Sequence, residues 1–209
     1  MIDKFLNLEP EKKDRIINAA LEEFAREGYK NASTNEIVKN ANISKGLIFH
    51  YFENKKGLFL FLIDYTINIF ADELYGRINY EETDILKRWG QVVLLKIELI
   101  QKYPSLYAFL LKAFFDDSSE IRQELERIDK SIVEDAYRRL LINLDTGALK
   151  NGMDSERVIK MIIWVTQGFS NDELEKMKNN PEYRANFDIA AVKPEFDAYM
   201  ELLKKAFYK

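Results

Sequence analysis

The apolar residues of this chain recur with the period of an α-helix along almost its whole length. From Ile17 to Phe24, for example, they stand at positions i, i+3, i+4 and i+7, which lie on one face of a helix. No segment alternates apolar and polar residues long enough to predict a sheet. Eight glycines and four prolines are also too few for the turns of a 209-residue sandwich or barrel. The pattern therefore predicts an all-α fold.

Capping signals divide the first 80 residues into short helices. Pro10 suits the first turn of a helix, and Gly28 suits the left-handed position just past its end. Ser33 and Glu36 have the spacing of a capping box at the start of a second helix. Asn42 tolerates the left-handed conformation that a sharp turn requires. Ser44 and Asn54 are then expected to cap helices over 45–52 and 55–78, and Glu22, Glu23 and Glu27 to form a solvent-exposed face of the first helix.

Longer and more apolar helices are expected beyond residue 80. Pro104 and Pro194 suit the first turns of helices, and Ser119 and Asp154 suit N-caps. The stretches between these helices that contain glycine or proline are expected to be loops. The expected helices span 83–103, 104–116, 119–143, 154–178 and 194–208, and the expected loops span 144–153 and 179–193.

Composition excludes most catalytic and metal-binding chemistry. The chain has no cysteine and a single histidine, His50, so disulfides, thiolate metal sites and polyhistidine metal sites are excluded. There is also no glycine-rich phosphate loop. We therefore expect no catalytic residues, no metal and no cofactor. The longest apolar run, Leu58 to Ile63, is far shorter than the roughly 20 residues that span a bilayer, so a cytoplasmic protein without a membrane partner is expected.

The stretch 33–55 combines two short expected helices with a turn of three to four residues, which is the helix-turn-helix arrangement. A helix over 45–52 is about 12 Å long, and the major groove of DNA is about 12 Å wide. Thr34, Ser44 and Lys55 stand at helix starts, where free backbone N–H groups bind phosphate. Although the net charge of the chain is −4, residues 30–58 hold five lysines and two glutamates. This stretch is therefore suited to DNA.

Residues 11–71 resemble the DNA-binding domain of the TetR family of bacterial transcriptional regulators. The family pattern at the turn and the following helix resembles Ser-Lys-Gly-Thr-Leu-Tyr-x-His/Tyr-Phe, and residues 44–52 follow it closely. The resemblance implies a helix-turn-helix at about 34–53 and a helical ligand-binding and dimerisation domain over 72–209. The residues that carry it are Ala20, Phe24, Gly28, Tyr29, Thr34, Ile37, Ala41, Ser44, Gly46, His50, Tyr51, Phe52, Lys55 and Leu58.

Several positions depart from the family pattern. Leu47 replaces a common threonine and Phe49 a common tyrosine, so two hydroxyl groups are absent from the expected DNA-binding surface. Asn42 replaces the usual turn glycine, and Lys56 and Gly57 replace residues that are often acidic. We expect these departures to change which bases the DNA-binding surface prefers. The residues expected to contact DNA are Thr34, Ser44, Lys45, Gly46, Leu47, Phe49, His50 and Lys55.

The second part of the chain is rich in aromatic residues, and the resemblance implies that it encloses a small, mostly apolar effector. The candidate pocket residues are Tyr65, Asn68, Trp89, Phe109, Phe114, Tyr137, Trp164 and Gln167. Two apolar stripes near the C-terminus resemble the paired helices through which the family forms homodimers. Their residues are Val158, Ile162, Val165, Phe169, Phe196, Tyr199, Met200, Leu203 and Phe207.

The sequence is compatible with three classes of function. The first is a DNA-binding transcriptional regulator, a repressor that a small ligand releases from a palindromic operator. The second is a small-molecule binding protein with weak or lost DNA binding, since Leu47 and Phe49 depart from the pattern. The third is an all-α enzyme, which lacks a catalytic constellation. The sequence favours the first class.

Overall fold

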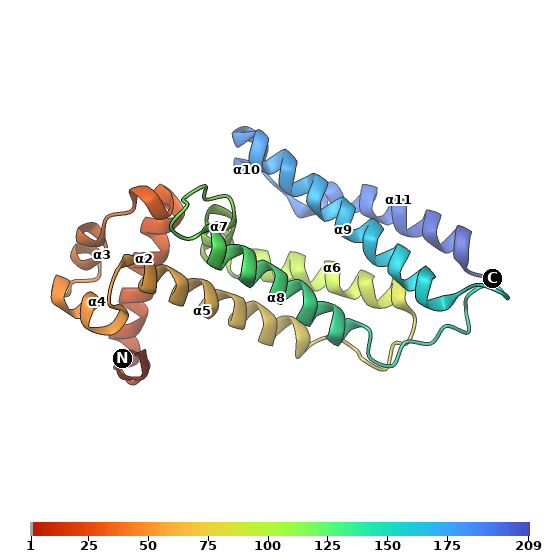
Figure 1. Cartoon of the computed structure of the whole chain (residues 1–209), viewed down its shortest axis with the longest axis horizontal. Helices are drawn as coiled ribbons and strands as arrows, with labels where there is room; N and C mark the ends of the chain where they lie inside the picture. Colours follow the sequence, from red (N-terminus) through yellow and green to blue (C-terminus); the bar gives the residue numbers. More distant parts are fainter. Residues whose placement is uncertain (1) are drawn as a thin grey trace. The chain divides into compact units, whose positions relative to one another are not determined.

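The computed structural model describes residues 2–209, without the side chains of Leu174 and Lys178, and the described chain contains eleven α-helices (Figure 1). No β-strand occurs in this range, where Leu149 and Tyr208 form an isolated bridge, so the predicted all-α fold is confirmed. No helix of the described residues has the length and apolar character needed to cross a membrane. The helices are α1 (Ile2–Leu6), α2 (Pro10–Asn31), α3 (Thr34–Asn40), α4 (Lys45–Phe52), α5 (Lys55–Tyr75), α6 (Ile85–Lys102), α7 (Pro104–Phe114), α8 (Arg122–Leu140), α9 (Ser155–Asn179), α10 (Pro181–Ala185) and α11 (Ile189–Phe207).

Most of the local signals act as the sequence predicts. Gly28 has φ 74° and ψ 175°, so it interrupts the helical path of α2 where the chain was expected to leave the first helix. Asn42 has φ 53°, the left-handed conformation expected at the turn after α3. The side chains of Asn54 and Asp154 accept backbone N–H groups at the starts of α5 and α9. These contacts are local, which is why the sequence reveals them.

The expected loop over 179–193 is wrong. It contains α10 and the beginning of α11, which starts at Ile189 because the Asp188 side chain accepts the N–H of Ala190 at 2.9 Å. Pro194 consequently lies inside α11 rather than in its first turn. It can remain there because a proline removes one hydrogen-bond donor without ending a helix that is held by other contacts. The prediction that Ser119 is an N-cap is also wrong, since α8 begins three residues later, at Arg122.

Contacts divide the chain into two compact units. The first unit contains the residues up to Gly76 together with Leu99–Asp135, and the second unit contains Arg77–Glu98 and Ala136–Lys209. The boundary between the units falls inside α6 and inside α8.

Aromatic rings form the core of the first unit. Phe24 of α2, Phe59 of α5 and Phe109 of α7 meet with ring centroids 5.0 to 6.3 Å apart. The short helix α1, which the sequence did not predict, places the buried ring of Phe5 against Phe52 of α4 at 4.8 Å. These contacts fix α4 and α5 on α2, since aromatic pairs at such distances add to the free energy of burial.

In the second unit, α9 and α11 run side by side (Figure 1) and pack through aromatic residues. Phe169 lies 5.4 Å from Phe196 and 6.0 Å from Tyr199, measured between ring centroids. The guanidinium of the fully buried Arg88 on α6 donates to backbone carbonyls, including those of Tyr80 at 3.1 Å and Leu140 at 3.0 Å. Arg88 therefore ties the segments before α6 and after α8 to this unit.

Candidate nucleic-acid interface

The helix-turn-helix is formed by α3, α4 and the turn between them. Ile37 and Ile48 are fully buried and hold the two helices on the core. The N–H of Ile43 donates to the carbonyl of Val38 at 3.0 Å, which closes the end of α3 and allows Asn42 to turn the chain. This compact geometry leaves one face of α4 free.

The exposed face of α4 is formed by two pairs of residues, 45 and 49 and then 46 and 50, whose members are four positions apart. Lys45, Gly46, Phe49 and His50 are all exposed, whereas Ile48, Tyr51 and Phe52 of the same helix are buried. The ammonium of Lys45 lies 5.9 Å from the centroid of the Phe49 ring. The structure thus brings four of the eight expected DNA-contacting residues onto one solvent-facing surface, which we call the α4 face.

Three other expected contact residues lie beside the α4 face. Ser44 is exposed at the N-cap of α4, and its side chain makes no capping hydrogen bond. Thr34 is half-buried at the start of α3. Leu47 is half-buried and packs against the core of the first unit, so its side chain faces largely away from solvent.

The expected phosphate contact Lys55 is engaged within the protein. Its ammonium donates to the carbonyls of Lys30 at 3.1 Å and Ala32 at 3.3 Å, and it lies 4.8 Å from the centroid of the Tyr29 ring. A lysine ammonium has three donors. Lys55 therefore holds the end of α2 with two of them.

The positive charge expected at Lys56 is neutralised by α8. The Lys56 ammonium pairs with Glu124 at 2.7 Å and donates to the carbonyl of Glu120 at 2.6 Å. The hydrogen bond from Lys56, followed by smaller contributions, lowers the pKa of Glu124 below its ordinary value. Lys56 therefore acts as a tie between α5 and α8 and does not add free positive charge beside the α4 face.

A second tie, which sequence analysis missed, is centred on Tyr29. Its N–H donates to Asp116 Oδ2 at 2.7 Å, and its hydroxyl donates to Glu120 Oε1 at 2.5 Å. Burial and then the Glu120 contact raise the pKa of Tyr29 above its ordinary value. We call these contacts and those of Lys56 the α8 latch, because they join α8 and the loop before it to the end of α2 and the start of α5. The partners are about 90 residues apart in the chain, so no local pattern reveals them.

The expectation that Glu23 belongs to a solvent-exposed face is wrong, since the side chain is only 2% exposed. Its Oε1 accepts the N–H of Ser33 at 2.8 Å, and it also pairs with Arg26. The contact with Ser33 satisfies a donor at the start of α3 that the predicted capping box assigned to Glu36. Ser33 Oγ accepts the N–H of Glu36 at 3.4 Å, so only half of that box forms.

The expected pocket residues are divided between the two units. Phe109 is buried in the core of the first unit, and Trp89 is buried in the second. Tyr65, Asn68 and Phe114 also belong to the first unit, and Tyr137, Trp164 and Gln167 to the second. Neither unit by itself gathers the eight residues around one space.

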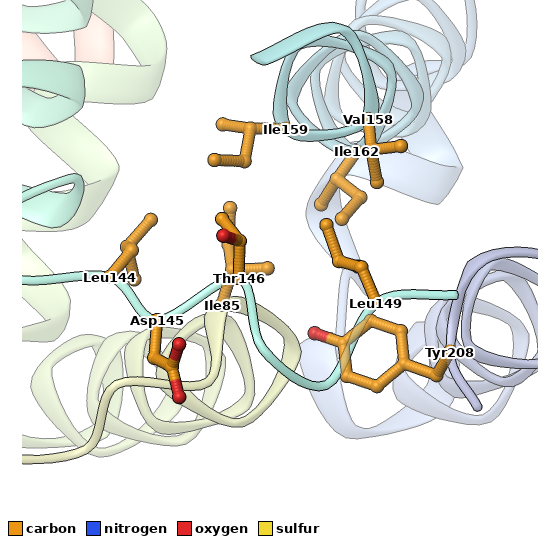
Figure 2. A pocket seen from close by; sticks show the side chains of 9 residues that line it. All are labelled: Ile85, Leu144, Asp145, Thr146, Leu149, Val158, Ile159, Ile162 and Tyr208. Atoms are coloured by element: carbon orange, nitrogen blue, oxygen red, sulfur yellow. The ribbon is translucent and has the colours of Figure 1, made fainter. Parts of the chain in front are cut away.

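The second unit contains a small cavity of about 10 Å³, which is space for about one water molecule (Figure 2). Figure 2 shows aliphatic side chains of α9 and the Tyr208 ring around it, with Asp145 at its polar end. Its volume is too small for an organic effector. The lining residues are Ile85, Leu144, Asp145, Thr146, Leu149, Val158, Ile159, Ile162 and Tyr208.

The residues expected at a dimer interface are mostly buried or half-buried within the chain. Val158, Ile162 and Phe196 are buried, and Val165, Phe169, Met200, Leu203 and Phe207 are half-buried. Tyr199 alone in this set is exposed. Among the described side chains of these helices, the large apolar ones most open to solvent are Trp164, 64% exposed, and Leu202, 63% exposed.

Comparisons with known proteins give a consistent result. Residues 16–62 match the family model described as bacterial regulatory proteins, tetR family. Over 148 residues the chain is 24% identical to the fatty acid metabolism regulator protein of Bacillus subtilis, a match that covers 71% of this chain and 76% of that protein. Over 127 residues it is 26% identical to the biofilm operon icaADBC HTH-type negative transcriptional regulator IcaR of Staphylococcus epidermidis, covering 60% and 68%.

The fold is also found in the crystal structure of the transcriptional regulator FadR from Bacillus subtilis in complex with stearoyl-CoA. The TM-score is 0.60 at 21% identity, and the match covers 91% of this chain and 96% of that one. The family match includes α3 and α4, the helices that present the α4 face. The helix-turn-helix thus lies in a domain that matches the tetR family of bacterial regulatory proteins, and both relatives that share most of the chain are named as regulators.

Proposed function

We propose that the chain is a homodimeric repressor that binds a palindromic operator through its α4 face and leaves it when a small, mostly apolar effector binds. The observation that carries the proposal is the α4 face itself. A helix of eight residues presents Lys45 and His50 to solvent, with buried side chains behind it fixing its direction. This is the arrangement with which a recognition helix enters a major groove. Repression is supported by the relative that is named a negative transcriptional regulator.

Dimerisation is inferred from the exposed apolar faces of α9 and α11. Trp164 and Leu202 are the most exposed large apolar residues whose side chains the structure describes on these helices. Met161 and Tyr199 precede them by three positions on the same faces. Burial of such side chains against a second copy is favourable. One recognition helix reads only a few base pairs, so a two-fold dimer reading a palindrome gains useful affinity.

The class of effector is inferred from the relatives. One is named a fatty acid metabolism regulator, and the similar Bacillus subtilis structure was determined with stearoyl-CoA. A long acyl chain agrees with the aromatic and aliphatic composition of residues 72–209. We therefore take stearoyl-CoA as the first probe, and we assign the expected pocket residues to effector binding on the same basis.

Selection of bound sequences from random double-stranded DNA, with and without stearoyl-CoA, tests the function. We expect enrichment of a palindrome whose half-sites are separated by about one helical turn, 34–36 Å, and loss of binding when stearoyl-CoA is added. Binding of stearoyl-CoA without enrichment of any DNA would favour a small-molecule binding protein instead. No catalytic activity is part of this proposal, and a DNA-binding repressor acts in the cytoplasm.

A further inference from the structure

The centre of the α4 face is an aromatic ring without a polar group. Phe49 is 38% exposed although it is a large apolar residue, and it stands one turn after Lys45 on the same side of the helix. A Cβ atom placed on the neighbouring Gly46 would meet no other atom within 4 Å. The surface of α4 beside the ring, at Gly46, is therefore open.

The chemistry of the major groove limits what such a ring can recognise. Base edges present hydrogen-bond donors and acceptors there, and the one apolar group they present is the C5-methyl of thymine. A phenyl ring has neither a donor nor an acceptor, so it gains by contact with that methyl group and loses when it covers a polar edge. Leu47 does not provide an alternative apolar contact of equal reach, because its side chain packs against the core.

We propose that Phe49 is a specificity-determining residue that reads the C5-methyl group of a thymine in each operator half-site. This rests on the function proposed above, since it requires that α4 enters the major groove. Lys45 complements Phe49. Its ammonium lies over the ring, 5.9 Å from the centroid, and keeps its three donors for a phosphate or an adjacent guanine.

Deoxyuridine tests this inference directly, because uracil lacks the methyl group of thymine and keeps the same hydrogen-bonding groups. The operator is first obtained with the full chain by selection from random DNA. Thymines are then replaced by deoxyuridine, at one equivalent position in both half-sites at a time. For at least one position we expect the Kd to rise by about fourfold per methyl contact, the value that follows from burial of one such group.

The same titrations with protein variants assign the effect to Phe49. Phe49→Ala is expected to bind more weakly and to bind the thymine and uracil operators equally well. His50→Ala, which changes a polar residue of the same face, is expected to bind more weakly while keeping the preference for thymine. Circular dichroism of each variant verifies that the helices are intact.

Three results would overturn the inference. The first is a wild-type protein that is insensitive to uracil at every thymine, which needs no variant to interpret. The second is a folded Phe49→Ala protein that keeps the full thymine preference. The third is a selection that enriches no DNA, which would also remove the proposed function, whereas the first two would leave DNA binding in place.

Discussion

At the scale of single residues, the two-residue connection between α4 and α5 is the most constrained point of the DNA-binding surface. Glu53 has φ 66° and ψ −48°, and the N–H of Asn54 donates to the carbonyl of Phe52 at 2.7 Å. These values are close to those of a γ-turn with positive φ, which is rare and strained. The strain is maintained because the turn places Lys55 where it reaches the end of α2.

Gly57 lies close to the backbone of the same turn. A Cβ atom at this position would lie 2.1 Å from the carbonyl oxygen of Phe52, and a backbone atom cannot give way as a side chain does. We expect Gly57→Ala to lower the free energy of unfolding by about 1–3 kcal/mol, as overpacking does elsewhere. Urea denaturation measures the change.

Gly46→Ala is the matched control for that measurement. A Cβ atom at Gly46 meets nothing within 4 Å. Alanine also has the higher helix propensity, so the variant should be as stable as the wild type or more stable by up to about 1 kcal/mol. Equal losses at the two positions would show that the contact with Phe52 is not the cause.

At the scale of elements, the α8 latch joins α2 and α5, which pack beside the helix-turn-helix, to α8 and the loop before it. Lys56 at the start of α5 is bonded to Glu120 and Glu124, and Tyr29 near the end of α2 is bonded to Asp116 and Glu120. The carboxylates come from the loop before α8 and from its first turn. The position of α5 therefore depends on α8, although the two helices are far apart in the sequence.

The ion pair between Lys56 and Glu124 gives the α8 latch a defined dependence on pH. The hydrogen bond from Lys56 lowers the pKa of Glu124, so the stabilising contribution is complete above the unfolded pKa of about 4.3 and is lost as the pH falls through the folded pKa. We expect Glu124→Gln to melt at a lower temperature than the wild type at pH 7, and the difference to shrink as the pH falls below about 4. Thermal melts across this range measure it.

Glu126→Gln provides the control for that series, since Glu126 is exposed on the same helix. It should melt as the wild type does at every pH. A Glu124→Gln protein with an unchanged melting temperature at pH 7 would mean that the ion pair contributes nothing to the stability of the first unit.

How far the sequence predicts an element depends on whether its signals are local. The predicted bounds of α4 are confirmed, with Ser44 at the N-cap position, although its side chain makes no capping hydrogen bond. The start of α11 does not follow from Pro194, because the Asp188 side chain caps the helix five residues earlier than Pro194 suggests. Glu23 and the α8 latch depend on partners elsewhere in the chain, and the eight pocket residues depend on which helix faces meet. Tertiary packing decides these, and a single sequence does not display it.

At the scale of the whole molecule, the exposed faces of α9 and α11 predict the oligomeric state. Trp164→Glu would place an unpaired charge in the proposed interface, which is costly to bury, so we expect a monomer where the wild type is a dimer. Sedimentation equilibrium distinguishes the two. Ile142→Glu changes an exposed apolar residue outside both helices and should leave the dimer intact. A Trp164→Glu protein that remains dimeric would place the interface elsewhere.

Control by an effector requires that its binding changes the α4 face. α8 continues across the boundary between the units and carries Glu124, so a movement of α8 reaches Lys56 and the start of α5. In a dimer, such a movement would change the separation of the two α4 faces, which must match half-sites about 34 Å apart. An effector lowers operator affinity only as far as it prefers the mismatched state.

The coupling between effector and operator can be measured as the effect of either one on the affinity for the other. With stearoyl-CoA as the probe, we expect the affinity for the operator to fall by roughly 5- to 150-fold, which corresponds to a coupling of about 1–3 kcal/mol. Because coupling is reciprocal, saturating operator is expected to lower the affinity for stearoyl-CoA by the same factor by which stearoyl-CoA lowers the affinity for the operator. Glu124→Gln is expected to reduce this factor while leaving the affinity for stearoyl-CoA without DNA unchanged, since it removes the ion pair of the α8 latch. Equal affinity for stearoyl-CoA with and without operator would contradict effector control by acyl-CoA, and an unchanged factor in Glu124→Gln would mean that the path does not run through the α8 latch.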